Sequence, residues 1–104
     1  MEKILIVDDS LLMRKILKDH LFNDKYEVVG EAVNGNEAVE MYSKFSPDVV
    51  TMDITMDEKN GLEAAKEILS INPHANIIMV SALNESQLLS NAFKIGVKDF
   101  IVKP

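Results

Sequence analysis

The chain has 104 residues, which is enough for one domain with a single hydrophobic core. Hydrophobic residues make up 47% of the sequence and the net charge is −6, so a nucleic-acid-binding surface, which needs clustered Lys and Arg, is not expected. The sequence has no cysteine, no signal-peptide pattern at its start, and no apolar stretch near the roughly 20 residues that span a membrane, so we expect a cytoplasmic protein without disulfides or membrane contact.

Short apolar runs alternate with longer amphipathic patterns along the chain. Residues 4–7 predict a strand buried on both faces. Ser10 is the expected cap of a helix whose apolar stripe consists of Met13, Ile16, Leu17 and Leu21. A second strand is predicted at 26–29. Asn36, in the turn 34–36, is the expected cap of the next helix, which carries Ala38, Val39, Tyr42 and Phe45.

The second half of the chain repeats this pattern. Pro47 ends the second helix, because proline disfavours helical geometry in the residue before it. A strand at 49–52 leads through a polar loop to Gly61 and a helix that buries Leu62, Ala65, Ile68 and Leu69. After a strand at 77–80, a helix from about residue 86 ends near Gly96, and its expected core residues are Leu88, Leu89, Ala92 and Phe93. Residues 100–102 predict the last strand.

This βαβαβαβαβ order predicts an α/β domain with a parallel sheet and helices on both of its faces. In such open sheets, ligands bind outside the carboxyl ends of the strands. We therefore expect the functional residues to follow directly after the strands.

Chemically active side chains do stand at four predicted strand ends. Asp8 and Asp9 follow the first strand, Asp53 the third, Ser81 the fourth and Lys103 the fifth. Carboxylates brought together repel one another unless a cation lies between them, and oxygen ligands without His or Cys favour Mg²⁺. A carboxylate can also attack phosphorus and form an aspartyl-phosphate, whose oxygens an ammonium and a hydroxyl could neutralise.

Taken one at a time, these residues have ordinary explanations. An Asp after a strand is usually a turn former or a helix cap, a Ser a loop hydroxyl, and a Lys a surface charge. Their joint placement is what indicates a site. His20 and His74 belong to no such pattern and are interpreted as surface residues.

The motifs together resemble the receiver domain of a two-component response regulator, most closely the chemotaxis type. The resemblance covers the whole chain and depends on ILIVDDS at 4–10, DVVTMD at 48–53, NG at 60–61, SA at 81–82 and KP at 103–104. It implies a flavodoxin-like, doubly wound sheet of five parallel strands in the order 2-1-3-4-5.

The resemblance also implies a role for each acidic residue. Asp53 would accept a phosphoryl group from a histidine kinase in a Mg²⁺-dependent reaction. Asp9 and Asp53 would bind Mg²⁺ directly, together with the backbone carbonyl of Thr55, and Asp8 would act through a metal-bound water. The chain would then be a phosphoacceptor that supports its own phosphorylation and dephosphorylation, not a classical enzyme.

The remaining residues would couple phosphorylation to shape. By resemblance, Ser81 moves toward the phosphoryl group, Lys103 pairs with its oxygens, and Phe100 changes rotamer. The face around the fourth helix and fifth strand would shift between two states and select a downstream target or output domain. The Lys103–Pro104 peptide matches a position that is cis in the family.

Two of the departures from the family pattern affect the acidic residues and the covering of the sheet. Asp57 stands where the family usually has Pro and adds a carboxylate near the acidic residues. The family also continues past Lys-Pro into a fifth helix, whereas the sequence given ends at Pro104. We expect a receiver domain at 1–104 that lacks this helix and exposes an apolar sheet face, through which copies could self-associate.

Three other functions fit parts of the pattern. An unphosphorylated docking module would share the fold but would not need the intact acidic set. A Mg²⁺-dependent phosphohydrolase with Asp53 as nucleophile would need a second Asp two residues later, where this chain has Thr55. A flavin or nucleotide binder would need a glycine-rich phosphate loop after the first strand, whereas residues 8–10 include two aspartates and no glycine.

Overall fold

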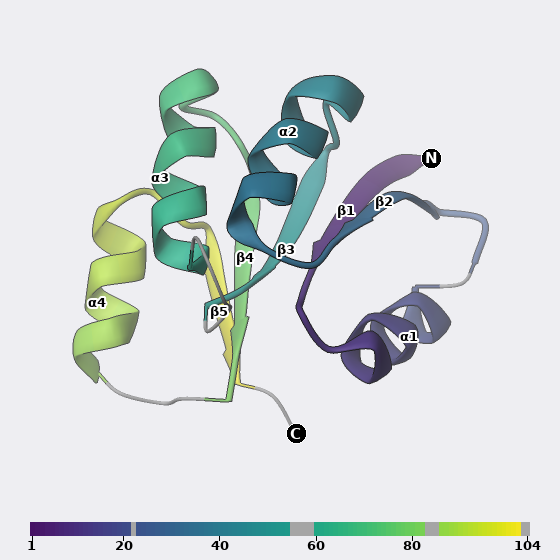
Figure 1. Cartoon of the computed structure of the whole chain (residues 1–104), viewed down its shortest axis with the longest axis horizontal. Helices are drawn as coiled ribbons and strands as arrows, with labels where there is room; N and C mark the ends of the chain where they lie inside the picture. Colours follow the sequence, from purple (N-terminus) through teal and green to yellow (C-terminus); the bar gives the residue numbers. More distant parts are fainter. Residues whose placement is uncertain (22, 55–59, 83–85, 103–104) are drawn as a thin grey trace.

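The computed structural model describes residues 1–21, 23–54, 60–82 and 86–102. The expectations for Thr55, Asp57, Lys103 and Pro104, including the cis peptide bond, lie outside these residues. Five strands and four helices alternate in the described parts, in the order β1 (Glu2–Val7), α1 (Leu11–His20), β2 (Tyr26–Ala32), α2 (Gly35–Phe45), β3 (Val49–Asp53), α3 (Gly61–Ile71), β4 (Ile77–Ser81), α4 (Ser86–Lys94) and β5 (Asp99–Val102) (Figure 1).

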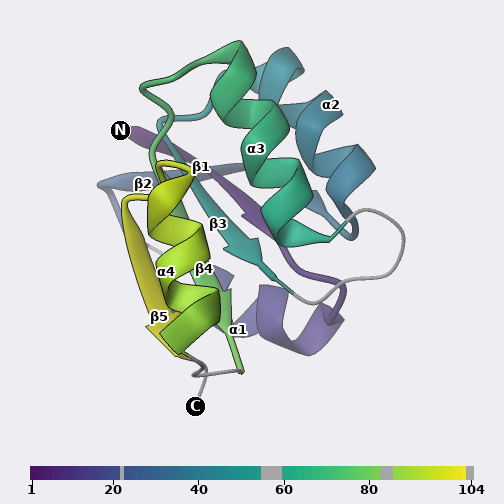
Figure 2. The same cartoon turned by 90° about the vertical axis from the view of Figure 1, so that its left-hand side faces the viewer.

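All strand pairs are parallel, and the strand order is β2-β1-β3-β4-β5. This confirms the predicted doubly wound sheet without a fifth helix in the described residues. Helices α2, α3 and α4 cover one face of the sheet, and α1 lies on the other (Figures 1 and 2). No helix in the described ranges is long and apolar enough to cross a membrane.

The main core lies between the sheet and helices α2 to α4. Alternate residues of the three central strands point into it and are almost completely buried: Leu5, Val7, Val50, Met52, Ile77 and Met79. The intervening residues face α1, and Ile4 and Ile6 are also buried there. The predicted burial of strand 4–7 on both faces is therefore confirmed.

Side-chain caps fix where three helices begin. The Ser10 hydroxyl accepts a hydrogen bond from the Met13 N–H at 3.2 Å, as predicted, and Asn60 accepts one from the Glu63 N–H at 3.0 Å. The predicted cap of α2 was wrong. Asn34, not Asn36, accepts from the Glu37 N–H at 2.9 Å, because Asn34 has the extended backbone that a capping residue needs.

Helix α4 ends where the sequence predicts, but its side chains are less buried than expected. Gly96 has a φ of +107°, and the N–H of Val97 donates to the Ala92 carbonyl at 3.2 Å, which is the glycine-terminated helix end that was predicted. The expected burial of Phe93 was wrong, since its side chain is 46% exposed, and Leu88 and Leu89 are only half-buried. Helix α4 lies toward the β5 edge of the sheet (Figure 2), and among its described residues Ala92 alone is buried.

An apolar groove of about 340 Å³ lies between α1 and the sheet. Its walls are Met13, Ile16, Leu17, His20 and Leu21 from α1 and the loop after it, and Thr51, Ile78, Val80, Ile101 and Val102 from the sheet. None of the α1 residues is fully buried, and Ile101 remains 49% exposed. The expected exposed apolar face is therefore present in the described chain, while self-association through it stays a prediction.

The side chain of Thr51, which lines the sheet wall of this groove, leads to a prediction about stability. In the described part of the chain, its hydroxyl oxygen is buried and has no hydrogen-bond partner. Thr51→Val, which replaces the hydroxyl by a methyl group, is expected to raise the free energy of unfolding by about 1 kcal/mol, since an unpaired buried hydroxyl costs that much. Urea denaturation of both proteins measures the difference, and a less stable variant would show that the hydroxyl is hydrated or bonded.

Candidate functional site

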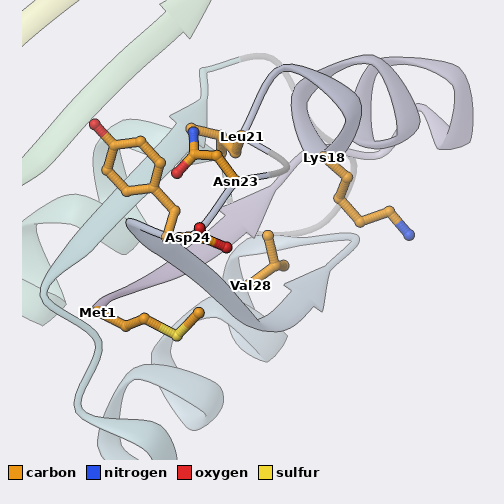
Figure 3. A pocket seen from close by; sticks show the side chains of 7 residues that line it. Met1, Lys18, Leu21, Asn23, Asp24 and Val28 are labelled. Carbon is orange, nitrogen blue, oxygen red and sulfur yellow. The ribbon is translucent and has the colours of Figure 1, made fainter.

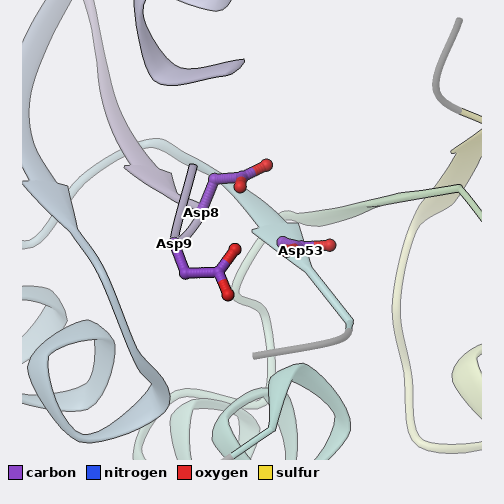
Figure 4. A group of neighbouring side chains, drawn as sticks. All are labelled: Asp8, Asp9 and Asp53. Atoms are coloured by element: carbon purple, nitrogen blue, oxygen red, sulfur yellow. The ribbon is translucent and has the colours of Figure 1, made fainter. Parts of the chain in front are cut away.

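The three aspartates predicted to converge do so at the carboxyl ends of β1 and β3. Asp8, Asp9 and Asp53 each place a carboxylate oxygen within 4.8 Å of the others (Figure 4). Their strands are neighbours, with Val7 paired to Met52. Asp8 and Asp53 are buried, whereas Asp9 is exposed. We call these three residues the acid cluster.

Asp8 is anchored through its backbone and its side chain. Its N–H donates to the Ala32 carbonyl of β2 at 3.0 Å, and its carboxylate accepts from the Ser10 N–H at 2.9 Å. The Asp8 carbonyl accepts from the Arg14 guanidinium at 2.8 Å. The first aspartate after β1 is therefore fixed by both β2 and α1 before any ligand binds.

Asp53 is held by the close approach of α3. The Gly61 N–H donates to the Ile54 carbonyl at 2.8 Å. A Cβ atom at Gly61 would overlap the Asp53 carbonyl oxygen and lie 2.8 Å from the Ile54 Cα. Only glycine fits here, which explains the Asn-Gly motif that the sequence showed without its reason.

Ser81 and Phe100 lie on the strands that continue this edge. Asp53 pairs with Val80, so the buried Ser81 is one residue further along β4. Ser81 in turn pairs with Val102 of β5, and the half-buried Phe100 packs against the core. The two strands predicted to carry the hydroxyl and the switch aromatic are therefore neighbours. Lys103 and Thr55 are outside the described residues, so their roles stay predictions.

The donor set of the acid cluster suits Mg²⁺. It consists of carboxylate oxygens alone, and two of the three groups are buried, where their mutual repulsion is least screened. Hard oxygen ligands favour Mg²⁺ over the softer metals that His and Cys would bind. A bound Mg²⁺ would supply positive charge shared between the carboxylates and the oxygens of a phosphoryl group.

An ion-pair network next to the acid cluster was missed by the sequence analysis. The Arg14 Nε lies 3.0 Å from one carboxylate oxygen of Glu31, and the Lys18 Nζ lies 2.9 Å from the other. The hydrogen bond from Lys18, with that from Arg14, lowers the pKa of the Glu31 carboxyl below its ordinary value of 4.5, although partial burial acts in the opposite direction. The available signal was Glu31 itself, a charged residue that follows the apolar pair Val28 and Val29 in β2.

This lowered pKa predicts a pH dependence of stability. A carboxyl group with a lowered pKa in the folded state stabilises the fold above pH 4.5 and loses that contribution as the pH falls through the folded-state pKa. Glu31→Gln is expected to cost about 0.5–1 kcal/mol at pH 7 and less below pH 4.5. Urea denaturation at both pH values checks this, and an equal loss at the two would contradict the ion-pair account.

A second hollow, of about 440 Å³, lies near the amino-terminal ends of β1 and β2 (Figure 3). Met1, Leu21, Tyr26 and Val28 form most of its apolar wall. Because Met1 and Tyr26 stand at the starts of β1 and β2, this hollow is a strand length away from the acid cluster. It is therefore not part of the candidate site.

Comparison with known proteins shows which family combines this fold with such an acid cluster. The sequence profile of the response regulator receiver domain matches residues 4–104. The chain is 54% identical to the chemotaxis protein CheY of Thermotoga maritima over 103 residues, which cover 99% of this chain and 86% of that protein. It is 53% identical to CheY of Bacillus subtilis over 102 residues, covering 98% and 85% of the two chains.

Solved structures share the fold closely. A chain in the CheX–CheY–BeF₃–Mg²⁺ complex from Borrelia burgdorferi has a TM-score of 0.96 at 36% identity, covering 99% of this chain and 78% of that one. The response regulator domain of Thermotoga maritima CheB has a TM-score of 0.94 at 44% identity, covering 100% and 79%. With the profile matching all five strands and the acid cluster, this chain belongs to the response regulator receiver domain family.

Proposed function

We propose that this receiver domain is switched by phosphorylation of Asp53 in a Mg²⁺-dependent reaction with a histidine kinase. The observation that carries the proposal is the acid cluster, in which the buried Asp53 carboxylate lies within 4.8 Å of two other carboxylates. Such a group at the carboxyl edge of a parallel sheet can bind a cation and attack a phosphoryl group.

In the proposed reaction, a carboxylate oxygen of Asp53 forms a bond to phosphorus as the bond from phosphorus to the imidazole nitrogen of the kinase breaks. The leaving nitrogen keeps the electron pair, and the leaving group is neutral imidazole because the other ring nitrogen carries a proton and retains it. Asp9, Asp53 and the Thr55 carbonyl would hold Mg²⁺ directly, and Asp8 would hold it through a water. Lys103 would pair with the phosphoryl oxygens, so the protein mainly positions groups and neutralises charge.

The proposed response begins at Ser81. Its hydroxyl would donate a hydrogen bond to a phosphoryl oxygen on Asp53, and Phe100 would turn into the space that Ser81 leaves. Support comes from the parallel pairing of β3, β4 and β5, which places Asp53 and Ser81 at one sheet edge and Phe100 two residues before the pairing partner of Ser81. The surface of α4 and β5 would then differ between the two states.

The partners of this surface are proposed from the relatives. The Borrelia burgdorferi structure is a complex of CheY with CheX, BeF₃ and Mg²⁺. We propose that the present chain likewise binds a downstream protein in its phosphorylated form, and a histidine kinase in its unphosphorylated form. No described feature favours the phosphohydrolase, and the docking module is the alternative that the experiment below separates.

Hydrogen exchange with and without acetyl phosphate, in Mg²⁺, tests the proposal. In the wild-type chain, the backbone amides of Ser81 and of residues 86–102 are expected to change their exchange rates, because α4 and β5 adopt a second arrangement on phosphorylation. Asp53→Asn should show no change, while the control Asp24→Asn, at an exposed carboxylate near the start of β2, should behave as wild type. A chain that takes up phosphate without any change in exchange would be no switch.

A further inference from the structure

A one-residue irregularity in β2 decides where Glu31 points. Ile4 pairs with Val28, but the next residue, Leu5, pairs with Gly30, so Val29 is an extra residue in β2. Because side chains alternate between the two faces of a strand, this insertion reverses the faces of all later residues. Glu31 therefore pairs with Ile6 and lies on the α1 face.

On that face, Glu31 meets Arg14 in the first turns of α1. The Arg14 side chain is only 11% exposed, and its guanidinium makes two hydrogen bonds in different directions. Nε donates to the Glu31 carboxylate at 3.0 Å, and Nη1 donates to the Asp8 carbonyl at 2.8 Å. Lys18 contacts the same Glu31 from the next turn of α1, at 2.9 Å from its other carboxylate oxygen.

Arg14 also closes a ring of hydrogen bonds around the first aspartate. The Asp8 carboxylate accepts from the Ser10 N–H at 2.9 Å, and the Ser10 carbonyl accepts from the Arg14 N–H at 3.1 Å. The Arg14 guanidinium returns to the Asp8 carbonyl. The orientation of the Asp8 carboxylate, the start of α1 and the Arg14 side chain are thus linked, and Glu31 fixes the ring to β2.

We infer that Arg14, held by Glu31, is a positioning residue that preorganises Asp8 in the acid cluster for cation binding. The inference rests on the proposed function, since it takes the acid cluster to be the Mg²⁺ site. Groups that orient a metal ligand commonly change affinity by about 10- to 100-fold when they are removed.

The role depends on the shape of the guanidinium as well as on its charge. A planar guanidinium can donate to Glu31 and Asp8 at once with fixed angles, whereas a lysine ammonium is a single point on a flexible chain. Arg14→Lys therefore keeps the charge near the acid cluster but opens the ring. Lys18→Gln removes a charge from the same network and leaves the contact between Arg14 and Asp8 in place.

Mg²⁺ titration of the unphosphorylated chain, followed by NMR of the backbone amides, tests the inference. Arg14→Lys and Arg14→Gln are both expected to bind Mg²⁺ about tenfold more weakly than wild type, and Lys18→Gln is expected to stay within about twofold. The spectra also show that each variant is folded at the temperature used, so a loss of affinity is separate from a loss of structure.

Two results would overturn the positioning role. Wild-type affinity in Arg14→Lys would mean that charge alone matters, and an equal loss in Lys18→Gln would mean that the whole ion-pair network acts through its electrostatic field. Failure of the wild-type chain itself to bind Mg²⁺ would overturn the proposed function as well. That outcome is distinguishable, because it appears before any variant is compared.

Discussion

Gly61→Ala is expected to destabilise the fold by about 3 kcal/mol and to remove most phosphorylation at Asp53. The added methyl group would overlap the Asp53 carbonyl oxygen and crowd the Ile54 Cα, and backbone atoms cannot move aside as a flexible side chain can. Either α3 or the end of β3 must shift, and the latter displaces the proposed acceptor. Urea denaturation measures the first effect, and intact mass after incubation with acetyl phosphate and Mg²⁺ measures the second.

Gly30→Ala is the matched control for this change. Its added methyl group would lie 3.3 Å from the Met41 sulfur and 3.4 Å from side-chain atoms of Leu5 and Phe45, which can adjust. We expect a cost of about 1 kcal/mol or less and normal phosphorylation, because the contact is with side chains remote from the acid cluster. Equal destabilisation by the two substitutions would contradict the close approach of α3 to Asp53.

Asp9→Asn is expected to weaken Mg²⁺ binding at least about tenfold and, in the absence of metal, to raise the melting temperature by about 2–5 °C. Both effects have one cause. Three carboxylates within 4.8 Å of one another repel without a cation and attract it when it is present. Asp9 is the exposed member of the acid cluster, so the substitution leaves the hydrogen bond from the Ser10 N–H to the Asp8 carboxylate intact.

Thermal melting with and without Mg²⁺ measures both effects in one series. Metal should raise the melting temperature of the wild-type chain more than that of Asp9→Asn, because a ligand that binds the folded state stabilises it by mass action. The control Asp24→Asn removes an exposed carboxylate near the start of β2 and should respond to Mg²⁺ as wild type does. A variant without metal that melts below wild type would argue against repulsion within the acid cluster.

The acid cluster could be predicted from the sequence because its position follows from simple rules. Alternating apolar runs predict parallel strands, and the carboxyl ends of parallel strands lie at one edge. Asp8, Asp9 and Asp53 follow such runs directly, so their convergence did not depend on side-chain detail. The strand order itself came from the family resemblance, since periodicity does not determine which strands are neighbours.

The environment of the acid cluster could not be predicted in the same way. The extra residue at Val29 places Glu31 on the α1 face, and register depends on packing between strands that are distant in sequence. The contacts of Arg14 follow from that register. The exposure of Phe93 was missed for a related reason, because a helical apolar stripe does not tell how much of a helix the sheet covers.

The cap of α2 shows a smaller limit of the same kind. Both Asn34 and Asn36 are good capping residues, and they stand on either side of Gly35. The choice depends on where the backbone leaves its extended conformation, and it does so after Asn34. Residue type therefore located the start of this helix only to within two positions.

The most direct test of the account is the intact mass of the wild-type chain after incubation with acetyl phosphate, with Mg²⁺ and with a chelator. We expect one phosphoryl group in Mg²⁺, none in the chelator, and none in Asp53→Asn under either condition, because the acid cluster needs its cation before Asp53 can react. Equal phosphorylation in the chelator, or a phosphoryl group on Asp53→Asn, would contradict the claim that these three aspartates form a metal-dependent phosphoacceptor site.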